Sequence, residues 1–173
     1  MLKEKKTAET AVEAVQLVTF KVGNEVFGLD IRCITEAVRP LKITPLPHMP
    51  AFIEGVVNLR GVIIPIVDLR KRFDIARTVE NPKKMRMLIT RGAIPGAAGS
   101  SRELLGLVVD SVQEVLHVPG KDIEPAPEAV MGESGFITSV GKVGDRLIML
   151  INITRILSTQ ERSALAEAGH AGY

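Results

Sequence analysis

The stretch that decides the fold is Phe52–Asp68, which reads FIEGVVNLRGVIIPIVD. Two short runs rich in β-branched residues, Val56–Leu59 and Val62–Val67, flank the pair Arg60-Gly61. Glycine accepts the positive φ that tight turns need, so the pattern predicts a β-hairpin with its turn at this pair. The second run is apolar at every position, which indicates burial on both faces, and Pro65 within it favours an edge or a bulge. A forked Arg60 at the turn would lie where a partner could reach it.

Similar patterns along the rest of the chain predict a mainly β protein with short helices. Apolar and polar residues alternate in short segments, which is typical of half-buried strands. Glycine and proline separate these segments, most clearly in the loops 39–50, 92–101 and 119–127. The expected strands are 15–22, 25–29, 34–38, 56–59, 62–67, 85–90, 104–109, 111–117, 136–143 and 146–151. The expected helices are a turn after Asp30, a short helix 69–73 capped by Asp68, and a final helix 153–168 capped by Asn152.

The chain contains an internal repeat. Residues 27–38 align with 105–116, and the downstream segment that begins at Phe52 aligns with the one that begins at Phe136. The turn Arg60-Gly61 then falls on Gly144-Asp145, and the cap Asp68 falls on Asn152. Each copy is too small to bury much apolar area alone, so the repeat predicts two β-barrel lobes of about five strands that share a core.

The expected domain organisation follows from this repeat. Residues 15–158 form one domain, with one lobe of roughly 30–83 and a second made of 15–29 and 84–158. Residues 1–14 are expected to be a flexible leader, and 159–173 a C-terminal helix and tail. The copies differ at the turn, where Asn58-Leu59-Arg60-Gly61 in the first corresponds to Lys142-Val143-Gly144-Asp145 in the second. A cation at one turn and none at the other is the asymmetry expected of a binding site.

Composition narrows the classes of function. The chain has 173 residues, 46% of them hydrophobic and 24% charged, with a formal net charge of +2. This small charge and the scarcity of aromatic residues argue against nucleic-acid binding. No apolar stretch reaches the roughly 18 residues of a membrane span, so no direct membrane insertion is expected. Cys33 is the single cysteine, which excludes an internal disulfide and favours a reducing, cytoplasmic location.

The sequence holds no recognisable catalytic or metal-binding constellation. The phosphate-binding glycine loops, the GxSxG nucleophile motif and the HExxH and CxxC metal spacings are all missing from it. We therefore expect no catalytic residues, no metal and no cofactor. The alternative that stays open is a small ligand-binding barrel or hydrolase that uses Asp68, Glu36 or His48. That alternative predicts a deep polar pocket with a titratable group of perturbed pKa, whereas an adaptor predicts an exposed apolar groove.

Several motifs together resemble the CheW family, the adaptors of bacterial chemotaxis signalling. They are FGLDIRCITEAV, FIEGVVNLRGVIIPIVDLRKRF, GLVVDSVQEVL, IEPAPE and DRLIMLINITRIL, and the resemblance runs from about Gln16 to Ser158. It implies two five-stranded SH3-like β-barrels with a hydrophobic core between them, plus short helices. It also implies a non-enzymatic role in the cytoplasm, at membrane-associated arrays. The implied partners are the cytoplasmic hairpin tip of chemoreceptors, the regulatory domain of the histidine kinase CheA, and other family copies in rings.

The resemblance also implies which residues make these contacts. The receptor-proximal positions are Ile34, Glu36, Gly55 and the run Asn58, Leu59, Arg60 and Gly61. Arg60 would donate to a polar or acidic group on the receptor, and Ile34 and Leu59 would anchor its helices. Ile43 and Leu46, in the loop after the third strand, are the expected kinase contacts. The loop 92–101 is longer than a minimal hairpin and the loop 128–135 is weakly patterned, and both are expected to tune the choice of partner.

Overall fold

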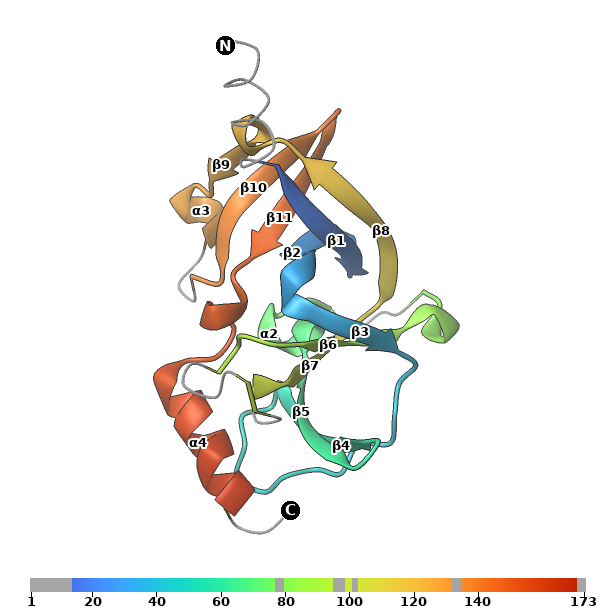
Figure 1. Ribbon diagram of the computed structural model, residues 1–173, viewed down its shortest axis with the longest axis vertical. Coiled ribbons are helices and arrows are strands. Elements are labelled where there is room, and N and C mark those ends of the chain that lie inside the picture. The colour runs from blue at the N-terminus through green and yellow to red at the C-terminus, as the bar shows by residue number, and fades with distance from the viewer. Residues whose placement is uncertain (1–13, 77–79, 95–98, 101–102, 132–134, 171–173) are drawn as a thin grey trace.

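The computed structural model describes residues 14–76, 80–94, 99–100, 103–131 and 135–170. It confirms a mainly β fold built from two sheets (Figure 1). The strands are β1 (Val15–Val22), β2 (Glu25–Asp30), β3 (Ile34–Val38), β4 (Ile53–Leu59), β5 (Val62–Asp68), β6 (Arg86–Thr90), β7 (Leu105–Val109), β8 (Ser111–Val118), β9 (Ile123–Pro125), β10 (Ile137–Val143) and β11 (Arg146–Ile151). The α-helices are α2 (Leu69–Arg72), α3 (Glu128–Met131) and α4 (Thr159–His170). Single 3₁₀ turns are η1 (Ile31–Cys33), η2 (Pro82–Lys84), η4 (Gly120–Asp122) and η5 (Ile153–Arg155).

Each sheet forms one lobe. The first lobe, in the lower half of Figure 1, is the five-stranded sheet β3-β6-β7-β5-β4, and the second is the six-stranded sheet β8-β1-β2-β11-β10-β9. Each sheet contains one parallel pair, with Ile66 opposite Gly106 in the first lobe and Leu150 opposite Gly28 in the second. These pairs are equivalent under the sequence repeat, which confirms the repeat at the level of strand register.

The predicted division of the lobes at residue 84 is wrong for β6 and β7. Both strands belong to the first lobe, where β6 pairs with β3 and β7 pairs with β5. The hairpin β6–β7 is the repeat equivalent of β1–β2, and each of these hairpins completes the sheet of the opposite copy. The chain therefore passes from the first lobe to the second at Asp110, between β7 and β8.

The core has three parts. The largest cluster lies between the lobes and takes residues from both sheets, among them Phe20, Leu29 and Leu107. Each lobe adds a smaller cluster of its own, around Ile66 in the first and Ile148 in the second. A core shared between two small barrels was the expectation. Because neither sheet buries much apolar surface alone, the cluster between the lobes is what stabilises them as one unit.

The expected burial of β5 on both faces is confirmed. Pro65, expected at an edge or a bulge, is not at an edge, but the register of β4 shifts between Ile53 and Gly55, opposite the two residues that follow Pro65. Ile64 and Ile66 pack into the first-lobe cluster, whereas Val67 faces the cluster between the lobes. Strand β5 lies between β4 and β7 rather than at an edge. Pro65 is tolerated there because the pairing with β7 begins only at Ile66, so no ladder bond needs the missing N–H.

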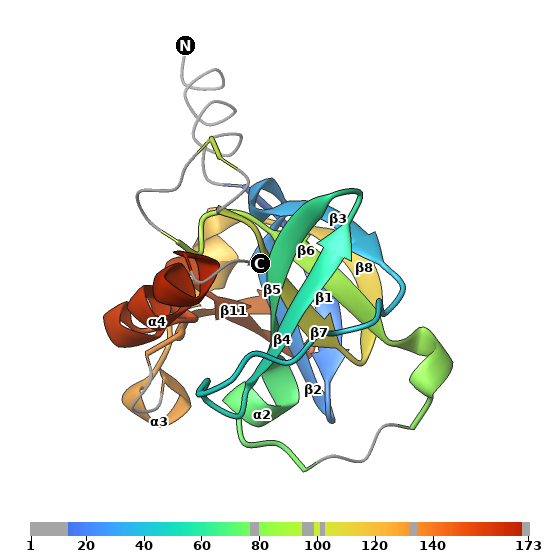
Figure 2. The same ribbon diagram turned by 90° about the horizontal axis from the view of Figure 1, so that it is seen from below.

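The C-terminal region differs from the predicted single helix 153–168. Asn152 caps only the turn η5, and the chain then breaks before α4 begins at Thr159. The break is a capping box, in which the Glu161 N–H donates to Ser158 Oγ over 3.1 Å and the Ser158 N–H donates to Glu161 Oε1 over 2.6 Å. In Figure 2, α4 lies beside the first lobe.

The short elements β9, α3, η2 and η4 were not predicted. Parts of the loops 92–101 and 128–135, namely 95–98, 101 and 132–134, lie outside the described residues. Strand β9 and helix α3 form within segments that were expected to be loops. The leader 1–13 and the tail 171–173 are also outside the described part of the chain. No helix in the described part is long and apolar enough to cross a membrane.

Candidate functional site

The turn between β4 and β5 is the two-residue hairpin turn that the sequence predicts. Arg60 and Gly61 both have positive φ, of 52° and 85°, which is the conformation of a type I′ turn. The side chain of Asn58 fixes it, because its Oδ1 accepts a hydrogen bond from the Gly61 N–H over 2.8 Å. The turn therefore holds Arg60 at a defined position at the end of the hairpin.

Arg60 forms an ion pair with Glu36 of β3, in which Arg60 Nη2 donates to Glu36 Oε1. The strands β3 and β4 are the two edges of the five-stranded sheet, so the pair links one edge to the hairpin that carries the other. The Arg60 side chain is nonetheless 68% exposed and that of Glu36 33% exposed. Because a guanidinium has five N–H donors, Arg60 retains donors for an acceptor on another molecule.

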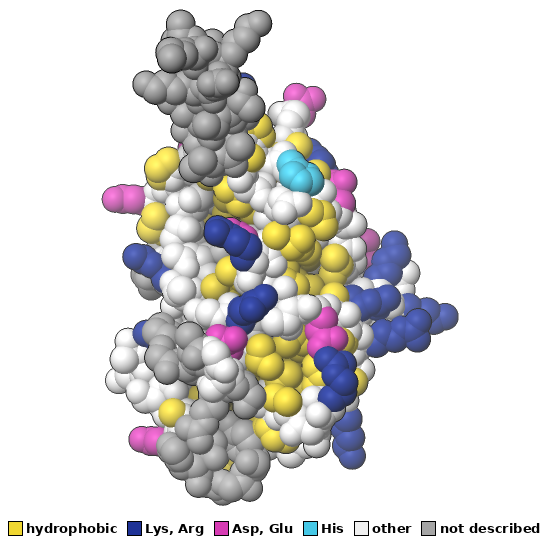
Figure 3. Space-filling view, in the orientation of Figure 1, with side chains coloured by type: hydrophobic (Ala, Val, Ile, Leu, Met, Phe, Trp, Pro, Cys, Tyr) yellow, Lys and Arg dark blue, Asp and Glu magenta, His cyan; other side chains and the backbone are white. Residues whose placement is uncertain are grey.

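Apolar side chains neighbour this ion pair along the strands, with Val38 two residues after Glu36 on β3 and Leu59 directly before Arg60. Val38, Leu59 and Val62 are half-buried and pack against the first-lobe cluster. Figure 3 shows an apolar area over the first lobe, with acidic and basic side chains beside it. We call the group Glu36, Leu59, Arg60 and Val62 the turn site. Ile34, also expected here, is half-buried but packs against the cluster between the lobes.

Gly55, also expected at the receptor-binding surface, lies beneath the loop that follows β3. It is buried, with φ of 140°, and a Cβ atom built on it would overlap the carbonyl oxygen of Thr44. The Thr44 backbone exchanges hydrogen bonds of 2.8 and 2.9 Å with Val56 directly beside it. Gly55 thus permits the loop after β3 to close over β4, and its burial speaks against a direct receptor contact.

The two residues expected to contact the kinase lie on either side of Thr44. Both Ile43 and Leu46 are half-buried. Ile43 packs against the first-lobe cluster, whereas Leu46 packs against the cluster between the lobes. They therefore do not form one apolar patch by themselves.

The second lobe carries a related ion pair that the sequence reasoning missed. Arg146 Nη2 lies 3.2 Å from Glu114 Oε1, and Glu114 is the repeat equivalent of Glu36. The two turns differ as expected, with a cation in the first and none in the second, but both lobes have an arginine–glutamate pair beside the turn. Arg146 follows the turn Gly144-Asp145 instead of lying in it, so an alignment of turn with turn overlooks it. The matching glutamates were the signal that could have found it.

The residues of the enzyme alternative do not converge. Glu36 lies on β3, His48 lies in an exposed loop, and Asp68 caps α2 by accepting from the Arg70 N–H over 2.9 Å. Burial raises the pKa of Asp68, as expected for a partly buried helix cap. A polar cavity of about 370 Å³ lies at the junction of the lobes, and its lining includes none of these three residues.

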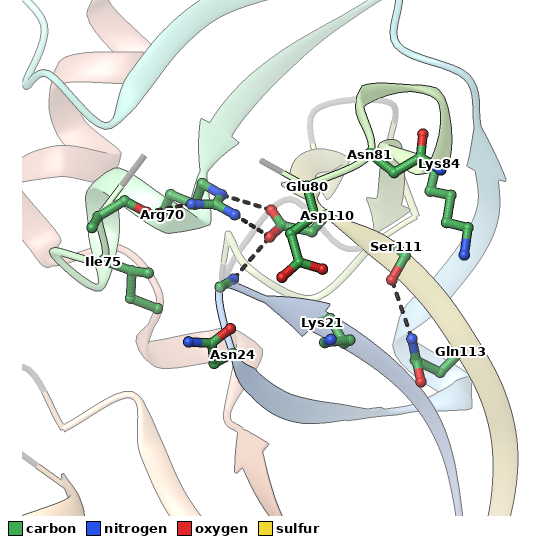
Figure 4. A pocket seen from close by; sticks show the side chains of 12 residues that line it. Lys21, Asn24, Arg70, Ile75, Glu80, Asn81, Lys84, Asp110, Ser111 and Gln113 are labelled. Atoms are coloured by element: carbon green, nitrogen blue, oxygen red, sulfur yellow. Dashed lines mark hydrogen bonds and ion pairs between the residues drawn. The ribbon is translucent and has the colours of Figure 1, made fainter. Parts of the chain in front are cut away.

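That cavity is built around a buried ion pair (Figure 4). Arg70 Nε donates to Asp110 Oδ1 over 2.7 Å, and Asp110 Oδ2 accepts from the Gly23 N–H over 2.9 Å. This pair joins α2 to the turn between β1 and β2, so it connects the two lobes. Across the described residues, no group of three or more His, Cys, Asp or Glu side chains is arranged to hold a metal ion.

A family model described as a CheW-like domain matches residues 16–161. The chain belongs to the CheW family. It is 34% identical to the chemotaxis protein CheW of Klebsiella aerogenes over 147 residues, which cover 84% of this chain and 83% of that protein. It is 32% identical to CheW of Treponema pallidum, over 89% of this chain and 88% of that protein.

Solved structures agree with this CheW membership. The crystal structure of the scaffolding protein TtCheW from Thermoanaerobacter tengcongensis superimposes with a TM-score of 0.74 and 35% identity. The match covers 85% of this chain and 90% of TtCheW. The CheW fold of two SH3-like lobes is thus the fold of this chain.

Proposed function

We propose that this protein is a non-enzymatic adaptor that couples the cytoplasmic tips of chemoreceptors to the histidine kinase CheA. The observation that carries the proposal is the turn site, where an exposed, fixed guanidinium lies beside half-buried apolar side chains. Its support is the chain's membership of a family whose relatives are named chemotaxis proteins and a scaffolding protein. On this proposal the protein works in the cytoplasm, at membrane-associated arrays, without a cofactor.

The turn site suits a helical receptor hairpin. Such a hairpin offers apolar side chains at helical spacing and polar or acidic groups between them. Leu59 and Val62 would contact its apolar face, with Ile34 as a further anchor. Arg60 would donate to a carboxylate or a carbonyl of the hairpin, and Glu36 would keep the guanidinium oriented between binding events.

The kinase contact is proposed for a different surface. The loop that carries Ile43 and Leu46 runs beside β4, an edge strand of the first lobe. The resemblance implies that the regulatory domain of CheA is built from related barrels that pair with this one end to end. End-to-end pairing of such barrels would also allow contacts with other copies of the family in rings. The half-buried side chains of Ile43 and Leu46 would supply apolar area to such an interface.

The test is binding of the purified protein to a receptor cytoplasmic fragment and, separately, to a CheA regulatory domain. We expect Arg60→Glu to weaken receptor binding by about tenfold or more, because it removes the donor and places two carboxylates together. Kinase binding and the unfolding midpoint should change little, because Arg60 is exposed. Arg60→Ala repeats the test without the added repulsion.

Arg146→Glu is the matched control, since it makes the same change to the related ion pair of the second lobe. Loss of receptor binding in Arg60→Glu but not in Arg146→Glu places the contact at the turn site. Equal receptor binding by wild type and both Arg60 variants would refute the assignment, as would unfolding of Arg60→Ala. Binding of the wild type to neither partner would refute the adaptor function itself.

A further inference from the structure

Arg72, the last residue of α2, contacts both lobes and the C-terminal helix at once. Its guanidinium carbon lies 4.4 Å from the ring centroid of Phe52 and 5.5 Å from that of Phe136. Phe52 precedes β4 in the first lobe, and Phe136 precedes β10 in the second. The Arg72 side chain is only 15% exposed, so these cation–π contacts are largely shielded from water.

The two phenylalanines are equivalent positions of the repeat, and each is fixed to its own lobe in the same way. The Asp68 N–H donates to the Phe52 carbonyl over 2.8 Å, and the Asn152 N–H donates to the Phe136 carbonyl over 2.8 Å. Arg72 therefore lies where the two halves of the repeat meet. A change in the relative position of the lobes must change its contact with at least one of the rings.

The remaining donors of Arg72 point to the C-terminal segment. Its Nε donates to the Ile156 carbonyl over 2.9 Å, and its Nη2 lies 3.5 Å from Glu161 Oε1. The same Glu161 oxygen accepts from the Ser158 N–H, which is half of the capping box that starts α4. The Arg72 side chain thus contacts both the first turn of α4, through Glu161, and the two rings at the contact between the lobes.

We infer that Arg72 couples the docking of helix α4 to the relative position of the two lobes. Coupling of this kind is reciprocal: when α4 is docked, its acceptors hold the guanidinium between the rings, and when the lobes are aligned, the rings hold the guanidinium against α4. Arg72 is a positioning residue here, and the inference does not depend on what the turn site binds.

The test is hydrogen–deuterium exchange of the full-length protein, with Arg72→Leu compared with wild type. Leucine keeps apolar volume between the rings but removes the charge and both polar contacts. We expect exchange about tenfold faster in three separate segments, namely α4, the residues that follow Phe52 and those that follow Phe136. The central strand β6 should keep its protection, because it is hydrogen-bonded on both sides, to β3 and to β7.

Arg162→Leu is the matched control. Arg162 also holds α4, through bonds of 3.2 Å to the Thr154 carbonyl and to Thr159 Oγ1, and both of these partners belong to the C-terminal segment. The variant Arg162→Leu should speed hydrogen–deuterium exchange in α4 alone. A second readout is the distance between spin labels at Lys83→Cys in the first lobe and Asp145→Cys in the second, in a Cys33→Ser background. That distance distribution should broaden in Arg72→Leu and stay unchanged in Arg162→Leu.

Two outcomes would overturn the inference. If Arg72→Leu speeds exchange in α4 only, with an unchanged distance distribution, Arg72 merely seats the helix. If no segment changes, its contacts carry no coupling. Arg72→Lys keeps the charge but not the planar guanidinium, so it should give the same pattern of faster exchange at smaller amplitude. If Arg72→Leu does not fold, Arg72→Lys replaces it in both measurements.

Discussion

At the scale of single residues, Gly55 is the described glycine at which an added Cβ atom would come closest to another atom. Its positive φ and the Thr44 carbonyl above it leave no room for a Cβ atom. We expect Gly55→Ala to lower the free energy of unfolding by about 3 kcal/mol or more, since the loop after β3 must move away from β4. Urea unfolding followed by circular dichroism measures this loss.

Gly61→Ala provides the comparison for Gly55→Ala. Gly61 also has a positive φ, but a Cβ atom there would meet nothing within 4 Å. Gly61→Ala should therefore lower the free energy of unfolding only through the unfavourable positive φ of alanine, by about 1 kcal/mol. Equal unfolding midpoints for the two variants would show that the close approach of Thr44 carries no energetic weight.

The turn and Gly55 show how far single residues could be placed from the sequence. Arg60 and Gly61 could be placed in a turn because their conformation depends on neighbours in the chain. The pairing of Arg60 with Glu36 depends on the closing of the barrel, which brings β3 to the hairpin. Gly55 was assigned to the binding surface by resemblance, whereas its burial depends on a loop that local sequence does not position.

At the scale of elements, the two caps Asp68 and Asn152 allow a direct comparison. Both accept a backbone N–H two residues on, over 2.9 and 3.0 Å, at the end of equivalent strands. Only Asp68 carries a charge, and burial raises its pKa in the folded state. A raised folded pKa stabilises the protein at low pH, and that contribution is lost as the pH rises through the folded pKa.

We therefore expect Asp68→Asn to keep the cap and to be at least as stable as wild type at pH 7. Its advantage should shrink as the pH falls, because Asp68 then becomes protonated and uncharged in both states. Asp68→Ala, which removes the cap, should instead cost about 1 kcal/mol at low pH and less at pH 7, where it also removes the buried charge. Thermal unfolding between pH 3.5 and 7 measures both variants. An advantage of Asp68→Asn that grows toward low pH would contradict this account.

Most strands could be predicted to within a residue or two, because period-two alternation is a local signal. One exception is β4, which begins at Ile53 and continues through Gly55 rather than starting at Val56. The others are short elements that owe their structure to neighbours. Strand β9 has three residues and exists by pairing with β10. The break before α4 did have a local signal, the Ser158 and Glu161 spacing of a capping box, and the apolar stripe that continues across it hid that signal.

At the scale of the whole molecule, Arg70 and Asp110 hold the lobes together through a largely buried ion pair. The Arg70 side chain is 5% exposed and that of Asp110 is 14% exposed. We expect Arg70→Met to lower the free energy of unfolding by about 3 kcal/mol or more, because it leaves a buried carboxylate without its cation. Chemical denaturation of the full-length protein measures the loss.

A double-mutant cycle of Arg70→Met with Asp110→Asn tests whether the loss comes from the unpaired carboxylate. The double variant should lose less than the sum of the two single losses, since neither partner is then left charged and alone. Strict additivity would mean that the two side chains act independently, contrary to their bidentate contact. The asparagine can still accept from the Gly23 N–H, which keeps that link comparable across the cycle.

The two lobes and their shared core could be predicted because the repeat is visible in the sequence. The membership of each lobe could not, because sequence order does not say which sheet a hairpin joins. The assignment of β1–β2 to the second lobe was correct, and the repeat required the equivalent hairpin β6–β7 to join the first lobe. Splitting the chain at residue 84 broke that symmetry.

The exchange of hairpins also bears on how the protein is made. On the ribosome, β1 and β2 emerge early, yet β2 pairs with β11, near the other end of the chain. The second sheet therefore stays incomplete, with an open edge, until β11 has been synthesised. The first sheet can be completed once β7 has emerged, so it is the natural template on which the later strands assemble. Cleavage of the chain at Asp110 would leave the β1–β2 hairpin on one fragment and the rest of its sheet on the other.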